Sequence, residues 1–450
     1  MKRFIVPLLT AVMVVSIIFA GCMPAAAPPV TPPPVTPPPV TPPPVTPPEE
    51  VEPIKVGVGT AVTGVLADDG RHHIRALEIA RDEINAVGGL LGRPVELVVV
   101  DIGDCTPPEL VSARDTLKAA DVDVVNSNWF KLPQAMTFLL EVGVLTVHHG
   151  WVSSDWDQWW AIRDEYPYYM CLNEGEQGYG IPYFQGLMNP EMITWEYPNK
   201  TVAIQTCDTL YTLRQENWWI GEAERQGWEI VYRDVHAIGT AEFGPHLAKI
   251  RALDPAPAIV WMNSVISEEV IPFFAEFLED PTQSLFIITW MIEKPEFLGA
   301  FGEVANGVVG TLPGFHFHAS EYTGQNQQYR THYHLGKTLG AEYRQRYGEE
   351  PSVQVPIAYD SFWIWADAVA RVGDVRDFDA IQQAMIDHPY VGATARYAFD
   401  PETHACTYAV DAIPINYFQV QGGEVYNIAI GVGMDVEIID PFVLPYWLEE

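Results

Sequence analysis

The stretch EINAVGGLLGRPVELVVVD, residues 83–101, holds the end of a helix, a turn and a strand in that order. Apolar residues from Ile74 to Val87 recur at close to helical spacing, which predicts a helix there. Gly88 and Gly89 are expected to end this helix, because glycine tolerates the left-handed backbone that a helix C-cap needs. The apolar run from Pro94 to Val100 then predicts a strand.

The same alternation of short apolar strands and helices continues on both sides of this stretch. Ile54–Gly59 precedes it as a strand, and strands and helices alternate through two blocks, residues 54–172 and 174–311. Such alternation builds parallel sheets with helices on both faces. A third block, helical and mixed, runs from residue 312 to the end. We therefore expect an α/β fold, and a folded part of about 400 residues fits two lobes better than one core.

The first 21 residues have the features of a secretory signal peptide. Lys2 and Arg3 precede the apolar run Phe4–Phe19, and two small residues stand directly before Cys22. The segment Phe19-Ala20-Gly21-Cys22 resembles the bacterial lipobox, which implies cleavage before Cys22 and lipid on that cysteine. The alternative is an uncleaved membrane anchor, but a run of about 16 residues is shorter than the roughly 20 that span a bilayer. We expect a lipid-anchored protein of the cell envelope, outside the cytoplasmic membrane.

Residues 22–52 are expected to be a linker between that anchor and the folded part. From Pro28 to Pro48 the unit Val-Thr-Pro-Pro-Pro recurs, and such a run has no side chains with which to build a core. It should be extended polyproline II, about 3.1 Å per residue. A proline-rich ligand for a signalling domain is the other use of such a segment, but a spacer is the better interpretation here.

Charge and composition exclude several classes of function. The chain has 59 acidic and 25 basic residues, a net charge of −34, which makes nucleic acid a poor partner. Outside the lipidation site, the cysteines are Cys105, Cys171, Cys207 and Cys406. None forms a CxxC pair, and adjacent histidines such as His148 and His149 rarely chelate together, because they point to opposite faces of an extended chain. His316 and His318 would have better metal geometry on a strand, but we expect no metal and no cofactor. The sequence leaves the pairing of these four cysteines open.

Several motifs, taken in order, are similar to the leucine/isoleucine/valine-binding proteins of ABC importers. The first strand runs into Thr63-Gly64, and residues 83–101 match the family's helix–turn–strand stretch. Tyr347–Pro351 and Gly392–Asp400 resemble later segments. The resemblance covers residues 54–425, and the order of the motifs is more specific than any one of them.

This resemblance implies a two-lobed type I periplasmic-binding-protein fold in which the chain crosses between the lobes three times. Lobe I would comprise residues 53–173 and 312–417, and lobe II residues 174–311 and 418–450. The ligand would lie in the cleft, and the protein, a monomer, would deliver it to an ABC permease without being an enzyme.

Candidate ligand-binding residues follow predicted strands, because open parallel sheets bind ligands at the carboxyl ends of their strands. Lobe I supplies Asp69, Trp129, Lys131, His148, His149, Gly150 and Trp151. Lobe II supplies Tyr211, Asn263, Ser264, Trp290 and Glu293.

The resemblance gives some of these residues specific roles. Tyr211 matches a position whose aromatic side chain closes over the ligand, although surface packing is the alternative. Asp69 matches a ligand-facing position, and helix capping is its alternative. His148 and His149 are the histidines expected to contact ligand, and Gly150 suits a close approach of the backbone to it.

Both halves of the family's amino-acid clamp are altered in this chain. The segment Trp129–Lys131 replaces a small Ser-rich loop that takes the carboxylate. The glutamate that holds the ammonium falls nearest Glu293, but the strict register places Met291 or Ile292 there. The ligand is therefore expected to be a small organic solute: an amino acid, an amide or a carboxylate, with an aromatic or apolar body.

Two other functions are less well supported. A ligand-sensing receptor module would bind a similar solute, but the chain carries no signalling domain. A carbohydrate-active enzyme is suggested by Asp155 and Asp157 beside Trp156, Trp159 and Trp160. No Gly-x-Ser-x-Gly elbow, HExxH pair or P-loop accompanies them.

Overall fold

The structure is a computed structural model that describes residues 51–150, 152–173, 175–314 and 321–448. The signal peptide, Cys22 and nearly all of the linker lie outside the described residues. None of the described helices combines the length and apolar character needed to cross a bilayer.

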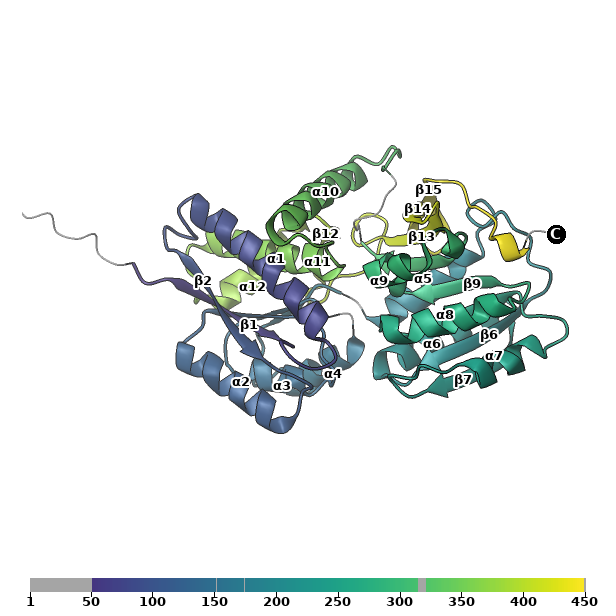
Figure 1. Cartoon of the computed structure of the whole chain (residues 1–450). Helices are drawn as coiled ribbons and strands as arrows, with labels where there is room; N and C mark the ends of the chain where they lie inside the picture. Colours follow the sequence, from purple (N-terminus) through teal and green to yellow (C-terminus); the bar gives the residue numbers. More distant parts are fainter. Residues whose placement is uncertain (1–50, 151, 174, 315–320, 449–450) are drawn as a thin grey trace, which may run out of the picture. The chain divides into compact units, whose positions relative to one another are not determined.

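The first sheet has five parallel strands in the order β2-β1-β3-β4-β5 (Figure 1). Its strands are β1 Ile54–Thr60, β2 Val95–Asp101, β3 Val124–Ser127, β4 Thr146–His148 and β5 Tyr169–Cys171. The second sheet contains eight strands in the order β15-β14-β13-β10-β9-β8-β6-β7. Its strands are β6 Thr201–Cys207, β7 Glu229–His236, β8 Ile259–Asn263, β9 Leu285–Thr289, β10 Val309–Pro313, β13 Ile415–Gln421, β14 Glu424–Val432 and β15 Asp435–Ile438. A two-stranded ribbon is formed by β11 Tyr390–Val391 and β12 Arg396–Tyr397.

Helices cover both sheets. They are α1 Ala67–Ala86, α2 Pro107–Ala120, α3 Ala135–Leu140, α4 Ser153–Ile162, α5 Glu176–Leu187, α6 Leu210–Arg225, α7 Gly244–Arg251, α8 Ser267–Glu279, α9 Pro295–Phe301, α10 Gln327–Tyr347, α11 Gln354–Val372 and α12 Phe378–Asp387. On the first sheet, α1, α11 and α12 lie on one face and α2 and α3 on the other (Figure 1). The α/β fold expected from the sequence is confirmed.

The helix–turn–strand stretch has the structure that its residues predict. Helix α1 ends at Ala86, and Gly88 and Gly89 both adopt positive φ, +106° and +82°. A Cβ at Gly89 would stand 2.0 Å from the carbonyl oxygen of Arg93, so only glycine fits this turn. Helix α1 begins earlier than its apolar periodicity predicted, because its first turn carries acidic residues that favour the positive end of the helix dipole.

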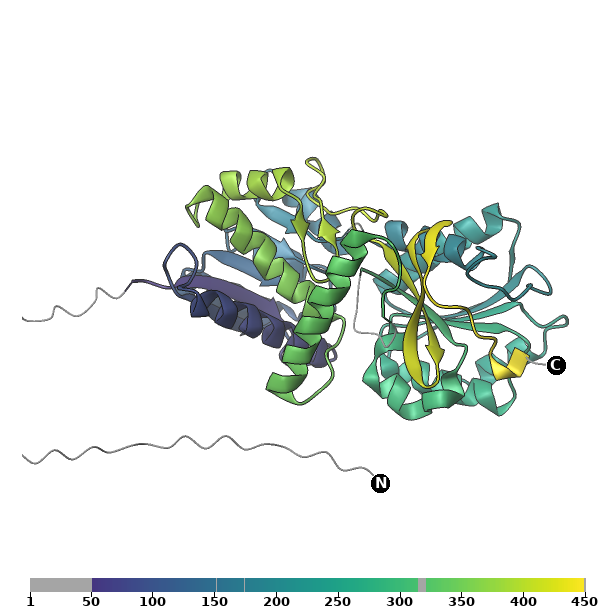
Figure 2. The same cartoon turned by 90° about the horizontal axis from the view of Figure 1, so that it is seen from above.

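The second sheet extends beyond its parallel part in a way that the sequence did not indicate. Strands β6 to β10 are parallel, whereas β13 pairs antiparallel with β10, and β14 and β15 continue that antiparallel edge (Figure 2, yellow). The lobe boundaries expected after residues 311 and 417 fall inside β10 and β13, both of which belong to the second sheet. The chain passes between the sheets after β5, after β10 and between β12 and β13.

All four cysteines in the described part of the chain are buried free thiols. The N–H of Cys406 donates to the carbonyl of Cys171 at 2.9 Å, so their backbones are neighbours. Cys171 is bridged to Ala405, however, and successive residues of an extended segment point to opposite faces. The side chains of Cys171 and Cys406 accordingly lie in different hydrophobic clusters, which leaves them badly placed for a disulfide.

Candidate functional site

An apolar cavity lies at the carboxyl ends of strands from both sheets. From the loops and helix starts that follow β1, β3 and β4 it is lined by Val65, Leu66, Trp129, Phe130, Lys131, Pro133, Val152, Ser154 and Asp155. From the loops and helix starts that follow β6, β7, β8 and β9 it is lined by Thr209, Leu210, Tyr211, Ile238, Val265, Ile266, Trp290 and Met291. Its volume is about 110 Å³, comparable to the roughly 150 Å³ of an apolar cavity that holds benzene.

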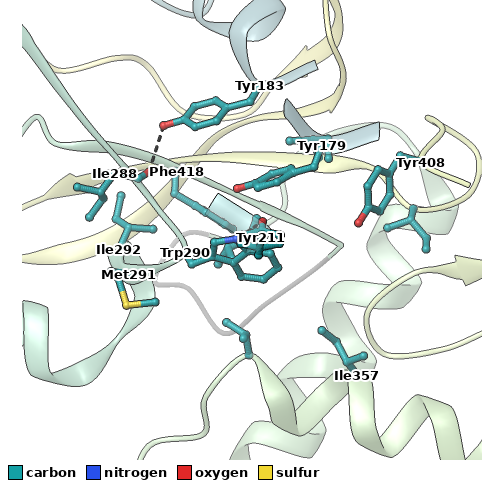
Figure 3. Close-up of a cluster of buried hydrophobic side chains, with 14 of the residues drawn as sticks. Tyr179, Tyr183, Tyr211, Ile288, Trp290, Met291, Ile292, Ile357, Tyr408 and Phe418 are labelled. Carbon is teal, nitrogen blue, oxygen red and sulfur yellow. Dashed lines mark hydrogen bonds between the residues drawn. The ribbon is translucent and has the colours of Figure 1, made fainter. Parts of the chain in front are cut away.

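Aromatic side chains are part of the cavity lining, and Figure 3 shows two of them, Tyr211 and Trp290, side by side in a cluster of buried side chains. The indole N–H of Trp290 donates to the hydroxyl of Tyr211 at 2.5 Å, and the two rings meet edge to face. Trp129, from the first sheet, contacts Trp290 edge to face with ring centroids 5.5 Å apart. Tyr179 of α5 packs on Trp290 from the other side, at 5.6 Å. The aromatic wall therefore combines side chains from both sheets.

Trp290 has an unusual backbone conformation. Its φ of +64° with ψ of −42° is one that residues with a side chain rarely adopt. Such a conformation costs on the order of 1–3 kcal/mol and persists only where the surroundings fix it. Here the strained residue directly follows β9 and turns the chain into the 3₁₀ turn Met291–Glu293, which brings the indole into the cavity.

A lysine and an aspartate are among the residues that line the cavity. Lys131 Nζ lies 3.0 Å from Asp104 Oδ2, and hydrogen bonding to Lys131 lowers the pKa of Asp104. Asp155, from α4, is buried, and its Oδ2 faces Nε2 of His148 at 3.3 Å. Burial raises the pKa of Asp155, which favours its neutral form. The cavity thus offers one ammonium at its edge and one buried carboxyl group.

Of the residues that the sequence predicted, four line the cavity: Trp129, Lys131, Tyr211 and Trp290. Asp69 is not among the lining residues, because its carboxylate pairs with Lys294 at 3.1 Å. Trp151 lies outside the described residues. A role in ligand binding remains a prediction for the whole set.

The predicted residues after β4 lie behind the cavity rather than on its surface. Neither ring nitrogen of His149 has a hydrogen-bond partner among the described residues, and its imidazole packs edge to face on His73 at 4.8 Å. At Gly150 a Cβ would stand 2.1 Å from Nε2 of His148. The close approach that requires glycine is therefore to the His148 ring.

The remaining lobe II predictions lie away from the lining. Asn263 donates to the carbonyl of Thr212 at 3.1 Å, and the Ser264 hydroxyl donates to the carboxylate of Glu269. Glu293 is half-buried and lines a different cavity together with Lys337 and Arg344. The polar groups of Asn263 and Ser264 therefore form hydrogen bonds within the fold.

The paired carboxylates suggested by Asp155 and Asp157 do not form. Asp155 faces His148, whereas Asp157 pairs with Arg214 at 2.9 Å. Residues two apart on a helix point in different directions. Trp156 and Trp160 stack on each other at 4.7 Å, which is packing rather than a sugar-binding platform.

Sequence reasoning missed the apolar part of the lining. Leu66, Ile238, Val265 and Ile266 all line the cavity from loops after strands. The sequence analysis singled out polar and aromatic side chains in those loops. For the apolar residues, the position directly after a strand is the signal that could have identified them.

Comparisons with known proteins agree with this architecture. A family model described as periplasmic binding protein matches residues 53–421. A search of curated proteins finds no match. Among solved structures, one named as a branched-chain amino acid ABC transporter, from Silicibacter pomeroyi, is 23% identical with a TM-score of 0.75, covering 88% of this chain and 100% of that one.

Two further structures were solved with ligands. The branched-chain amino acid transporter substrate-binding protein LivJ from Streptococcus pneumoniae, in complex with isoleucine, is 18% identical with a TM-score of 0.67 and covers 87% of this chain and 100% of that one. A solute-binding protein of an ABC transporter from Rhodopseudomonas palustris was solved in complex with 3,4-dihydroxybenzoic acid. It is 18% identical with a TM-score of 0.64, and the match covers 87% of this chain and 98% of that one. At these identities the likeness establishes the fold.

Proposed function

The chain belongs to the periplasmic binding protein family, and on that premise we propose that it captures a small organic solute outside the cytoplasmic membrane and delivers it to an ABC permease. It acts as a binding protein and not as an enzyme. The lipid on Cys22 and the Pro-rich linker tether it to the membrane. The interpretation as a type I protein of the leucine/isoleucine/valine-binding family is confirmed by the family match and the shared fold.

The observation that carries this proposal is the shared aromatic cavity. Trp129 follows a strand of the first sheet, while Tyr211 and Trp290 follow strands of the second. A ligand in this position contacts both sheets at once and so favours the conformation in which they close on it. It shifts the equilibrium between open and closed forms by its preference for the closed one.

The chemistry of the lining favours a monocarboxylate or amide over an amino acid. An aromatic or branched aliphatic body suits a cavity of about 110 Å³ walled by Trp129, Tyr211 and Trp290. Lys131 can meet a carboxylate at the edge. A ligand ammonium would need a free anionic acceptor, and the carboxyl group in the lining, that of Asp155, already faces Nε2 of His148 at 3.3 Å. The bound ligands of two structural neighbours, isoleucine and 3,4-dihydroxybenzoic acid, have bodies of this kind.

Matched pairs of compounds test the proposal. The full-length protein is screened by thermal shift with 4-methylpentanoate against leucine and with 3-phenylpropanoate against phenylalanine, each pair differing only in the ammonium. Benzoate, benzamide and glucose complete the screen. A ligand of the folded form raises the melting temperature by mass action, so we expect the deaminated acids to give the larger shifts. Larger shifts with the amino acids, or a shift with glucose alone, would contradict the ligand class.

A further inference from the structure

Three metal-ligating side chains meet at the carboxyl edge of the second sheet. Cys207 is the last residue of β6, His236 is the last of β7, and the two are register partners in that parallel pair. Glu269 lies in the first turn of α8. All three are buried, with at most 4% of any of them exposed. Strand pairing therefore brings together residues that are far apart in the sequence.

The distances between donor atoms suit a tetrahedral metal site. One donor atom from each side chain lies within 4.8 Å of the others. Cys207 Sγ is 3.6 Å from Glu269 Oε1, and His236 Nε2 is 3.0 Å from Glu269 Oε2. Zinc bonds of about 2.3 Å to sulfur and about 2.0 Å to nitrogen and oxygen place tetrahedral donors about 3.3–3.5 Å apart. The two measured distances between donor atoms, 3.6 Å and 3.0 Å, lie on either side of that range.

Charge balance also favours a divalent ion. A thiolate and a carboxylate contribute two negative charges, so a dication bound by both with neutral imidazole leaves the buried site without net charge. Burial of an unpaired charge would be costly. The types of donor atom also select among divalent ions. A cysteine thiolate and a histidine imidazole suit zinc, whereas magnesium and calcium prefer oxygen ligands.

Surrounding groups already orient these ligands. The side-chain amide nitrogen of Gln205 lies 3.0 Å from Nδ1 of His236, and the N–H of Gly239 and the hydroxyl of Ser264 both donate to Glu269. When Nε2 of His236 binds metal, the ring proton sits on Nδ1, and a half-turn of the Gln205 amide group would present its oxygen as the acceptor that such a histidine uses.

We propose that Cys207, His236 and Glu269 bind one zinc ion or a chemically similar divalent transition-metal ion. On binding, the Cys207 thiol becomes a thiolate and its proton passes to solvent. The inference does not depend on the proposed ligand class. The ion would hold together the loops from which Thr209, Ile238 and Ile266 line the cavity.

Cobalt substitution tests the site directly. Chelator-treated full-length protein is titrated with Co²⁺ and followed by absorption spectroscopy. We expect one equivalent to produce a thiolate-to-cobalt charge-transfer band and the intense visible bands of tetrahedral Co²⁺, both abolished by one equivalent of Zn²⁺. Cys207→Ser should lose the charge-transfer band, and Glu269→Gln should bind Co²⁺ at least tenfold more weakly. Cys171→Ser, which removes another buried thiol, should bind as the wild type does.

The Co²⁺ spectrum of the wild-type protein tests the proposed metal site even if a variant fails to fold. Absence of a thiolate band in folded wild-type protein would overturn the proposal, as would a Cys207→Ser variant that keeps the band.

Discussion

The carboxylate of Asp69 lies 3.1 Å from Nζ of Lys294, and this ion pair joins the first turn of α1 to the segment that follows β9. Both side chains are nearly buried, with 9% and 12% exposed. Burial opposes the charge of Lys294, but Asp69 outweighs it and raises the pKa of the ammonium. A residue expected to contact ligand instead connects the first sheet's helix to the second sheet.

Replacing Asp69 should destabilise the protein through this pair. Asp69→Asn leaves Lys294 without its carboxylate, and loss of a charged hydrogen bond at a buried site costs about 2 kcal/mol. Urea unfolding measures the loss. Asp68→Asn, at an exposed neighbour, is the control and should cost little. The double variant Asp69→Asn/Lys294→Gln should lose less than the sum of the two single variants, and losses that simply add would show that the pair does not couple.

Tyr211 should be needed for ligand binding. Tyr211→Ala removes an aromatic wall and the partner of the Trp290 indole, and truncation of a desolvated anchor typically costs about 2 kcal/mol, roughly thirtyfold in affinity. Calorimetry with the best ligand of the thermal screen measures it. Trp218→Ala, on the same helix but 43% exposed and outside the cavity lining, should bind normally. Unchanged affinity in Tyr211→Ala would place the ligand elsewhere.

Lys131 should matter only for an anionic ligand. Its ammonium is the cation in the cavity lining, so Lys131→Ala is expected to weaken benzoate by at least about tenfold while leaving benzamide nearly unaffected. Fluorescence titration of the tryptophans compares the two ligands. Lys118→Ala, at an exposed position on α2, controls for net charge. Similar losses for both ligands would mean that Lys131 acts by packing.

Acid should weaken the fold through Glu222. Hydrogen bonding from Arg225 lowers the pKa of Glu222 from 4.5 to about 2. A lowered acid pKa gives stability that is complete above about pH 4.5 and is lost as the pH falls towards 2. Melting temperatures measured between about pH 6 and pH 2 should therefore fall less steeply for Glu222→Gln. The exposed Glu224→Gln on the same helix should follow the wild type, and parallel curves for all three proteins would refute the assignment.

Two glycine substitutions should change stability in opposite directions. In Gly150→Ala the new methyl group meets the His148 ring, and overpacking of this kind costs about 1–3 kcal/mol. Gly221 is inside α6 with nothing within 4 Å of a built Cβ, so Gly221→Ala should stabilise by up to about 1 kcal/mol. Chemical unfolding reports both. A stabilised Gly150→Ala would show that the His148 ring moves freely.

The strands were the most predictable part of the fold. Strand β9, Leu285–Thr289, is an example, because a strand buried on both faces reads as an uninterrupted apolar run. The start of helix α6 at Leu210 is harder to predict, because its first two turns mix polar and apolar residues. The antiparallel β13–β15 was not foreseen, since the sequence beyond residue 312 was interpreted as a helical and mixed block.

Part of the cavity lining could be predicted from the rule that parallel sheets bind ligands at the carboxyl ends of their strands. Trp129 and Trp290 were found because each follows a strand, and parallel strands present their ligand sites at that end. The partnership of Asp69 with Lys294 was not, because 225 residues separate them and no local pattern links the two. The same limit applies to Cys207 and His236, which strand register alone makes neighbours.

The packing of α1 against α11 determines when one face of the first sheet can be fully covered during synthesis. Glu83 of α1 accepts a hydrogen bond at 2.6 Å from the hydroxyl of Tyr359 of α11, a residue 276 positions later in the chain. A growing polypeptide has therefore made all the strands of the first sheet long before α11, which covers one face of that sheet together with α1 and α12, exists. Contacts this distant form slowly, and exposed apolar faces promote aggregation meanwhile. A chain truncated after residue 313 should accordingly keep its second parallel sheet but aggregate through the uncovered face of its first.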